Sequence, residues 1–316
     1  MKLKPSLPVV TGMLLAALVV SNSSTARGQN LKQIADPDFD AKVAHPAFTK
    51  THPRLLFDEA HHNRHTTKGR FKPFADLMAN DGYEVTPNKK TFTKDSLRGF
   101  DVLVIANAAA QKEPSTKPAF TEAECDAVRA WVRGGGALLL IADHAPHGSA
   151  AKNLANRFGV DMRDGYTKDP EHCFRRNNVP FDWQLVFTRD NKLLIDHAIT
   201  KGRNRRETIR RVMTFGGQSL AGPKGSTAFL TLADTTVDRP SFRSKKKVSA
   251  AGRAQAVSLQ FGKGRVVVLG EAAMVTAQVL WVRGMGTQSP MGMNVAGIDN
   301  RQLSLNIMHW LSGILD

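Results

Sequence analysis

Four short apolar runs recur along the chain, and each of them ends in polar residues. They are residues 54–57 (RLLF), 101–106 (DVLVIA), 137–142 (ALLLIA) and 265–270 (RVVVLG). The apolar residues in each run are continuous rather than alternating, which is typical of strands buried on both faces, as in parallel sheets. The pattern therefore predicts four strands of a mainly parallel sheet.

Helical spacing of apolar residues separates the first three runs from one another and from the middle of the chain. It predicts helices over residues 71–80, 121–133 and 150–158. A further amphipathic helix is predicted at the C-terminal end, over residues 300–315. Strands alternating with helices indicate a doubly wound α/β fold.

The second helix carries a clear start signal. Thr121 and Glu124 form a T-x-x-E capping box, which places Cys125 at the position that packs against Phe120 in a hydrophobic staple. We therefore expect Cys125 to be a buried core thiol. The only other cysteine is Cys173, and the sequence leaves open whether the two form a disulfide.

Between about residues 160 and 254 the pattern loosens into an insertion rich in charges and turn residues. Residues 212–215 and 228–232 could be strands there. Residues 254–261 alternate in polarity, and the glycines of 262–264 connect them to the last apolar run as a hairpin. The insertion should therefore be irregular and partly antiparallel.

The N-terminal segment indicates export. Two lysines precede a twelve-residue apolar run, residues 9–20, and a small-residue cleavage site ends at Ala26. We predict a signal peptide over residues 1–26, with an uncleaved anchor as the alternative. Residues 27–52 are predicted to be a linker or extended arm, and 53–316 a single domain. No later segment is long and apolar enough to span a membrane, so we expect a periplasmic or extracellular protein.

Composition and charge narrow the function classes. A chain of 316 residues that is 41% hydrophobic can bury a large core, which excludes a disordered chain or a disulfide-stapled miniprotein. The net charge is +16, with basic runs at residues 201–211 and 245–247. Few aromatic residues lie among these charges and export removes nucleic acid, so we expect a solvated basic face. An anionic polysaccharide or envelope surface is a possible partner.

Polar residues gather directly after the apolar runs. In an open parallel sheet, ligands bind in the crevice beyond the carboxyl ends of the strands. Five of the ten histidines lie after the first and third runs, which is the sharpest signal in the chain. The candidate ligand-binding residues are Asp58, His61, His62, Asn63, Asn107, His147 and Glu271.

Three interpretations of this cluster remain open. His61 and His65 are four residues apart, which on a helix presents both rings to one side and suits a divalent metal such as zinc. Asp143, His144 or His147 could supply a third ligand, and we take His61, His65 and His144 as the candidate metal ligands. Alternatively the same groups line a metal-free polar pocket, which we favour, or serve structure alone.

Nucleophile motifs are weaker. Residues 217–221 (GQSLA) partly imitate a nucleophile elbow around Ser219, but Gly222 and Pro223 break the chain where a helix should follow. Ser149 is most simply a helix N-cap. Cys173 follows His172 in an irregular stretch, which makes a catalytic pair there unpromising.

Several stretches together resemble a known family. RLLFDEAHHN, LRGFDVLVIANA, FTEAECDAVRAWVRGGGALLLIADHAPHG and GKGRVVVLGEAAM are similar to the class I glutamine amidotransferase-like superfamily, and more narrowly to its uncharacterised secreted bacterial members. The resemblance covers roughly residues 52–160 and 255–316. It implies a flavodoxin-like doubly wound sheet with its site at the strand ends.

This chain differs from the family at the catalytic positions, and these differences decide whether the family's activity can be expected here. Working members place a cysteine after the strand that corresponds to residues 137–142, where this chain has Asp143 and His144, and the H-x-E pair is missing. Glutamine hydrolysis is therefore not expected. We expect a ligand-binding envelope protein for a small molecule or carbohydrate. The alternative is a hydrolase of a glycan or ester-type substrate. Asp143 or Glu59 would then be the general base, and His61, His65 and His144 would hold a metal or polarise the substrate.

Overall fold

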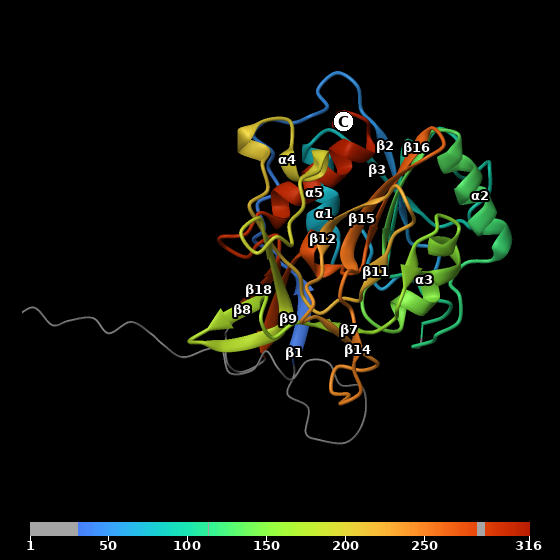
Figure 1. The fold of residues 1–316 in the computed structure, drawn as a ribbon. Helices are drawn as coiled ribbons and strands as arrows, with labels where there is room; N and C mark the ends of the chain where they lie inside the picture. The colour runs from blue at the N-terminus through green and yellow to red at the C-terminus, as the bar shows by residue number, and fades with distance from the viewer. Residues whose placement is uncertain (1–30, 113, 283–287) are drawn as a thin grey trace, which may run out of the picture.

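A nine-stranded mixed sheet forms the centre of the molecule (Figure 1). The structure is a computed structural model that describes residues 31–112, 114–282 and 288–316. The predicted signal peptide lies outside these residues. The parallel strands are β2 (Arg54–Asp58), β3 (Glu84–Asn88), β4 (Val102–Ala106), β5 (Ala137–Ile141) and β16 (Gly264–Leu269).

The parallel strands follow the order β3-β2-β4-β5-β16. In chain order this is 2-1-3-4-5, the flavodoxin-like arrangement. The four predicted strands are confirmed. The fifth, β3, was missed because it is a mostly exposed edge strand without an apolar run.

The sheet continues beyond β16 with antiparallel strands. β15 (Ala254–Phe261) pairs with β16 as the predicted hairpin, and β12 (Thr227–Thr231) and β11 (Leu220–Ala221) both pair with β15. β6 (Asp161–Met162) forms the far edge on β11. The fold is therefore a doubly wound α/β sheet with an antiparallel extension, as expected.

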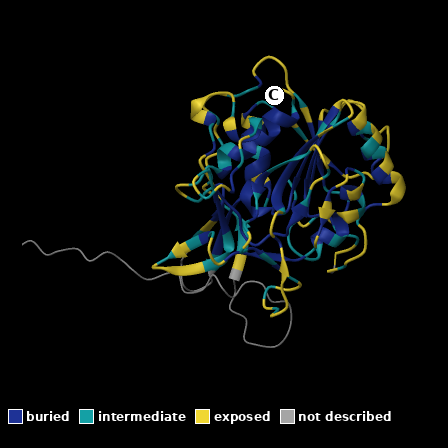
Figure 2. Ribbon diagram, in the orientation of Figure 1, coloured by how far each residue is buried: buried dark blue, intermediate teal, exposed yellow. Residues whose placement is uncertain are grey.

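Helices cover both faces of the sheet, as buried parallel strands require. α1 (Lys72–Asn80) and α5 (Asn300–Leu311) pack on one face, and α2 (Glu122–Arg133) and α3 (His147–Asn156) pack on the other (Figure 1). Leu139 of β5 belongs to the first core, and its neighbours Leu138 and Leu140 belong to the second. The central strands are accordingly buried throughout (Figure 2).

Two predicted helices have different bounds in the structure. α5 ends at Leu311 rather than at residue 315. α3 begins at His147 rather than at residue 150, with Pro146 at its N-cap. Ser149 therefore lies inside the first turn, where its hydroxyl donates to Asp164. The apolar spacing used for the prediction starts only at Ala150, because the first turn faces the end of the sheet.

The insertion forms two small sheets below the carboxyl ends of the parallel strands (Figure 1). One contains β8 (Cys173–Arg176), β9 (Val179–Thr188) and β10 (Arg211–Met213). The other contains β7 (Tyr166–Lys168), β13 (Val237–Arg239) and β14 (Val248–Ser249). The insertion also contains the short helices α4 (Ala198–Lys201) and η2 (Arg205–Glu207), and α4 lies beside α5 at the other end of the molecule (Figure 1).

Part of the predicted linker is a strand. β1 (Leu31–Ala35) pairs antiparallel with β17 (Ala277–Val282), which in turn pairs with β18 (Gln288–Gly292). The short helix η3 (Ala273–Val275) precedes β17. The N-terminal arm therefore docks beside residues about 250 positions later in the chain, a long-range pairing that local sequence does not encode.

The two thiols are apart and free. Cys125 is fully buried in the same core as Phe120, as predicted. Cys173 lies in β8 of the insertion. Among the described residues, no helix is long and apolar enough to cross a membrane.

The predicted capping box is present at the start of α2, and its removal tests its contribution. The Thr121 hydroxyl accepts a hydrogen bond from the Glu124 amide, and the Glu124 carboxylate accepts one from the Thr121 amide. We expect Thr121→Ala to lower the free energy of unfolding by about 1 kcal/mol, measured by urea denaturation. Thr91→Ala, at an exposed threonine outside any helix, is the control. Equal effects of the two changes would contradict a capping role.

Candidate functional site

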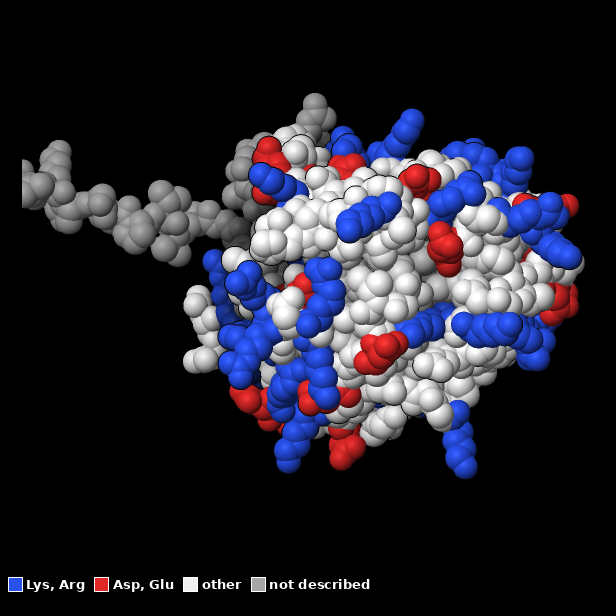
Figure 3. Space-filling view, turned by 90° about the horizontal axis from the view of Figure 1, so that it is seen from above, with Lys and Arg blue, Asp and Glu red and all other residues white. Residues whose placement is uncertain are grey.

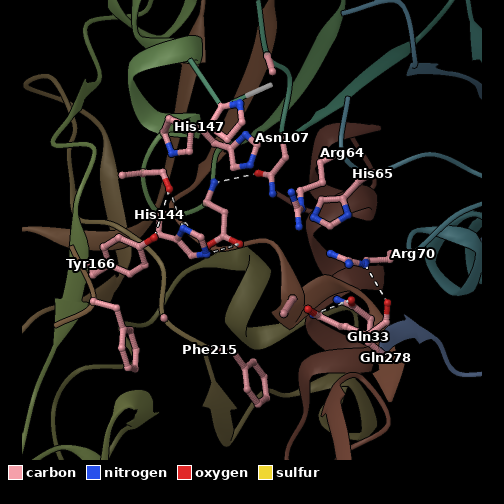
Figure 4. Close-up of a pocket in the computed structure, with 18 of the residues that line it drawn as sticks. Gln33, Arg64, His65, Arg70, Asn107, His144, His147, Tyr166, Phe215 and Gln278 are labelled. Carbon is pink, nitrogen blue, oxygen red and sulfur yellow. Dashed lines mark hydrogen bonds and ion pairs between the residues drawn. The ribbon is translucent and has the colours of Figure 1, made fainter. Parts of the chain in front are cut away.

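A cavity of about 470 Å³ lies at the carboxyl ends of β2, β4 and β5 (Figure 4). Strand order reverses between β2 and β4, so the cavity sits at the position where ligands bind in open α/β sheets. The structure brings six predicted residues to its lining: His62, His65, Asn107, Asp143, His144 and His147.

Asn107 connects the loops that surround the cavity. It has a positive φ of 48°, a left-handed conformation that asparagine tolerates better than most residues. Its side-chain oxygen accepts a hydrogen bond from the Asp143 amide at 2.9 Å, and its carbonyl accepts one from the Arg64 amide at 3.1 Å. His62 also has a positive φ, of 44°. Two non-glycine residues in this conformation beside one cavity are typical of a functional site.

Asp143 and His144 occupy the end of β5. The Asp143 carboxylate accepts a hydrogen bond from the His144 amide at 2.7 Å. The His144 ring stacks on Tyr166, with ring centroids 4.5 Å apart and an interplanar angle of 18°. His144 Nδ1 lies 2.9 Å from the Ala145 carbonyl oxygen, which can only accept, so Nδ1 is the donor of this hydrogen bond.

The two deeper histidines are held neutral. Burial lowers the pKa of His147 to about 4, although Asp143 opposes this shift. Burial, with the positive charge of Arg70, lowers the pKa of His65 well below its usual value. His65 is 4% exposed, and its Nδ1 has no hydrogen-bond partner among the described residues.

His61 is not part of the cavity lining. Its Nδ1 lies 2.9 Å from Asp58 and its Nε2 lies 2.8 Å from Glu124, the capping-box residue of α2. Burial alone would lower the pKa of His61, but Asp58 and Glu124 outweigh it and raise that pKa. His61 therefore joins the end of β2 to α2.

The predicted metal site is not assembled. The segment from His61 to His65 is not helical, so the two rings do not face the same side. His61 has both ring nitrogens engaged, while His65 and His144 lie in the cavity. Within residues 31–112, 114–282 and 288–316, no group of three or more His, Cys, Asp or Glu side chains is placed to hold a metal ion.

Three predicted residues of the first loop serve its structure. Asp58 is fully buried, and Asn63 donates to it from its side-chain amide at 3.0 Å. Glu59, a candidate general base, accepts hydrogen bonds from Thr67 and pairs with Lys89. None of the three predicted residues lines the cavity.

Glu271 is fully buried and also lies outside the lining. Its carboxylate accepts hydrogen bonds from the amides of Ala273 at 2.6 Å and Met274 at 2.7 Å, which caps η3. Burial, reinforced by the negative charge of Asp143, raises the pKa of Glu271 to about 8.

The remaining walls of the cavity come from residues that no sequence pattern singled out. The insertion contributes aromatic side chains, and the β1–β17 sheet and the first loop contribute a polar and basic wall opposite (Figure 4). The aromatic residues are Tyr166, Trp183, Phe215 and Phe242; the polar ones are Gln33, Gln278, Arg64 and Arg70. Among these residues only Arg64 lies shortly after the end of a predicted strand. The other wall residues could not be recognised from the sequence around them.

Ser219 has a structural role. It is fully buried, donates to Asp238 and accepts a hydrogen bond from Arg253 at 2.7 Å. The strand β11 follows it rather than a helix. The partial nucleophile motif is therefore part of the core of the insertion.

The basic runs lie in different places. Figure 3 views the edge opposite the cavity, where many basic and fewer acidic side chains are exposed. The run at 201–211 spans η2, and its Arg203 pairs with Glu207. The run at 245–247 is exposed in the loop that also carries Phe242 of the cavity.

Comparisons with known proteins support the fold but no family. No protein-family pattern matches this sequence, and no curated protein matches it significantly. The N-terminal domain of mmIFT52 is similar in structure, with a TM-score of 0.56 at 14% identity over 82% of this chain and 97% of that one. At this identity the similarity concerns the fold alone.

Other similar structures are more distant. A ThuA-like protein from Bacteroides uniformis has a TM-score of 0.43 at 14% identity, over 84% of this chain and 95% of that one. A ThuA-like protein from Parabacteroides merdae has a TM-score of 0.42 at 12% identity, over 84% of this chain and 91% of that one.

Replacing His61 tests its structural role between β2 and α2. His61→Ala leaves the buried carboxylates of Asp58 and Glu124 without their shared partner, and we expect the free energy of unfolding to fall by about 3 kcal/mol. The adjacent His62→Ala, at an exposed ring, should cost less than about 0.5 kcal/mol. Denaturant unfolding of both variants measures the difference, and similar losses would contradict the structural role.

The raised pKa of Glu271 predicts a pH dependence of stability. The unfolded chain ionises this group near pH 4.5, whereas the folded protein resists ionisation until about pH 8. Stability from this group is therefore complete below about pH 4.5 and is lost as the pH rises to about 8, with a slope of up to about 1.4 kcal/mol per pH unit. Glu271→Gln should flatten the curve of unfolding free energy against pH. If the variant shows the same slope of unfolding free energy against pH as the wild-type protein, the pKa of Glu271 is not raised.

Proposed function

We propose that this chain is a carbohydrate-binding protein with an amidotransferase-like fold, and that the cavity at the strand ends holds the sugar. The observation that carries this proposal is the pairing of an aromatic wall with a polar wall across one cavity (Figure 4). Sugar rings present an apolar C–H face and a rim of hydroxyl groups. The two walls match these two surfaces.

The aromatic wall is a connected set of rings. His144 stacks on Tyr166, Tyr166 meets the edge of Phe242 at 6.0 Å between centroids, and Phe242 lies 6.3 Å from Trp183. Such rings bury a large area against an apolar surface at little cost in conformational entropy. They can therefore hold the flat face of a pyranose.

The polar wall is fixed by its own hydrogen bonds. The Gln33 amide donates to Gln278 at 2.9 Å, and the Gln278 amide donates to Thr276 at 2.6 Å. Amide and carboxylate groups, here with Asn107 and Asp143, are suited to hydroxyl donors and acceptors. A cavity of about 470 Å³ is also within the range of small-molecule sites.

Amidotransferase chemistry does not form part of the proposal. Asp143 and His144 stand after β5 where a working member has its nucleophile. The thiol of Cys125 lies on the buried face of α2, and burial raises its pKa to about 12. Cys173, the second of the two cysteines, lies outside the cavity lining.

We further propose that the protein acts outside the cytoplasm. The support is the basic, apolar and small-residue order of residues 1–26. An exported protein meets cell-envelope and environmental glycans, which agrees with a sugar ligand.

A hydrolase is the second candidate, because the carboxylate of Asp143 and the imidazole of His144 lie close together in the cavity. His144 Nε2 lies 4.0 Å from the Asp143 carboxylate, and Asp143 is the one acidic residue among the described residues of the lining. A substrate on the aromatic wall would lie beside both groups. Asp143 would then act as general base or nucleophile, without Glu59.

Binding of sugars to the purified protein tests the proposal. Screening on a glycan array should identify a ligand, and isothermal titration calorimetry should then show that Trp183→Ala weakens its binding about 10-fold, because a stacking surface is lost. Phe181→Ala is the matched control: it lies on the same strand and contacts Phe174 instead of the cavity.

The possible outcomes separate the two candidates. Absence of any glycan ligand, or equal loss in both variants, would refute a sugar site in this cavity. Cleavage of the bound glycan that disappears in Asp143→Asn, with binding retained, would favour the hydrolase.

A further inference from the structure

The two arginines of the cavity have no ion-pair partner among the residues that the structure describes. Arg64 and Arg70 both line it, and neither forms an ion pair with a carboxylate of the described residues. Lys112 is a third basic residue of the lining. Asp143 is the one acidic residue that the structure describes there.

Arg70 is held in place rather than free to leave the site. Its Nε donates to the Gln33 carbonyl at 3.2 Å, which connects it to β1 (Figure 4). Burial, together with the like charge of Arg64, lowers the pKa of Arg70. A half-buried guanidinium beside a second one carries an electrostatic cost, which an anion between them would remove.

His65 adds a second, independent feature on the same wall. Its ring is almost completely buried and packs on Phe71, with centroids 4.8 Å apart, so it cannot turn away easily. Its Nδ1 has no hydrogen-bond partner among the described residues. Buried polar atoms in proteins are normally satisfied, so an unpaired one in a residue that lines the cavity points to a partner that the ligand supplies.

From this geometry we infer that the ligand is an acidic sugar, whose carboxylate or phosphate group binds between Arg64 and Arg70 beside His65 while its ring stacks on the aromatic wall. This inference rests on the proposed function and specifies its substrate class. Arginine is the side chain best suited to such a group, since its planar fork matches carboxylate and phosphate oxygens.

The rim of the cavity suits a longer acidic chain. The loop between β13 and β14 brings Phe242 to the aromatic wall, and it also carries Arg243 and the exposed lysines of residues 245–247. If one unit of an acidic polysaccharide lies in the cavity, the neighbouring units would lie next to these basic side chains. Positive charge at the mouth also speeds the approach of an anionic ligand.

Calorimetry with matched sugars tests this inference. The probes are trigalacturonic acid, its neutral methyl ester and galactose 6-phosphate, titrated into the full chain at low salt. We expect the acid or the phosphate to bind at least about 10-fold more tightly than the ester. Whichever of the two binds better identifies the anionic group. Equal affinity for acid, phosphate and ester would overturn the inference.

Charge-removing variants locate the anion. Arg70→Gln should weaken binding of the preferred acidic sugar at least about 10-fold and leave binding of the ester unchanged. Arg98→Gln, at an exposed arginine outside the cavity, is the control and should change neither. If Arg70→Gln weakens binding of the acidic sugar and of the ester to the same extent, Arg70 has only a structural role. That result would refute its assignment as a residue that binds the anionic group.

One further probe separates failure of this inference from failure of the proposed function. Inorganic phosphate and acetate are titrated in parallel into the wild-type protein and Arg70→Gln. If they bind in an Arg70-dependent manner while no sugar binds, the anion site stands and the carbohydrate function is wrong. If neutral sugars bind and no anion does, the carbohydrate function stands and the anion site is wrong.

Discussion

Burial of the parallel sheet on both faces is the constraint on which the rest of the structure depends. Leu138, Leu139 and Leu140 point alternately into two cores, so the strand is stable only with helices on each side. Each helix must then return the chain to the same edge. All parallel strands therefore end together, and the loops after β2, β4 and β5 meet there because of this connectivity, whatever their own chemistry.

The polar residues at that edge divide into two functions. Asp58, His61 and Glu124 form a buried network that joins a strand to a helix. A short distance away, Asn107, Asp143 and His144 face a cavity. Sequence position cannot separate Asp58 and His61 from the cavity residues, because both sets follow apolar runs. Their separation depends on the local path of the backbone, since a non-helical turn after β2 directs His61 and His65 to different surroundings.

The cavity also shows how an insertion can change a common fold. The sheet provides a floor with hydrogen-bonding groups, and the insertion adds the rings of Tyr166, Trp183 and Phe242. The N-terminal strand closes another side through Gln33 and fixes Arg70. Segments from both ends of the chain and from its middle thus build one site. A fold of this type can acquire a new ligand through such additions while its core stays the same.

The sequence by itself determined the layer architecture, because continuous apolar runs and 3.6-residue periodicity report burial directly. It also determined the start of α2, the burial of Cys125 and the hairpin of β15 and β16, which depend on local contacts. Only the tertiary structure decided which polar residues share a cavity, that β1 pairs with β17, and that the aromatic residues of the insertion face Arg64 and Arg70. These features depend on contacts between residues far apart in the chain, and no local pattern records which distant segments will meet.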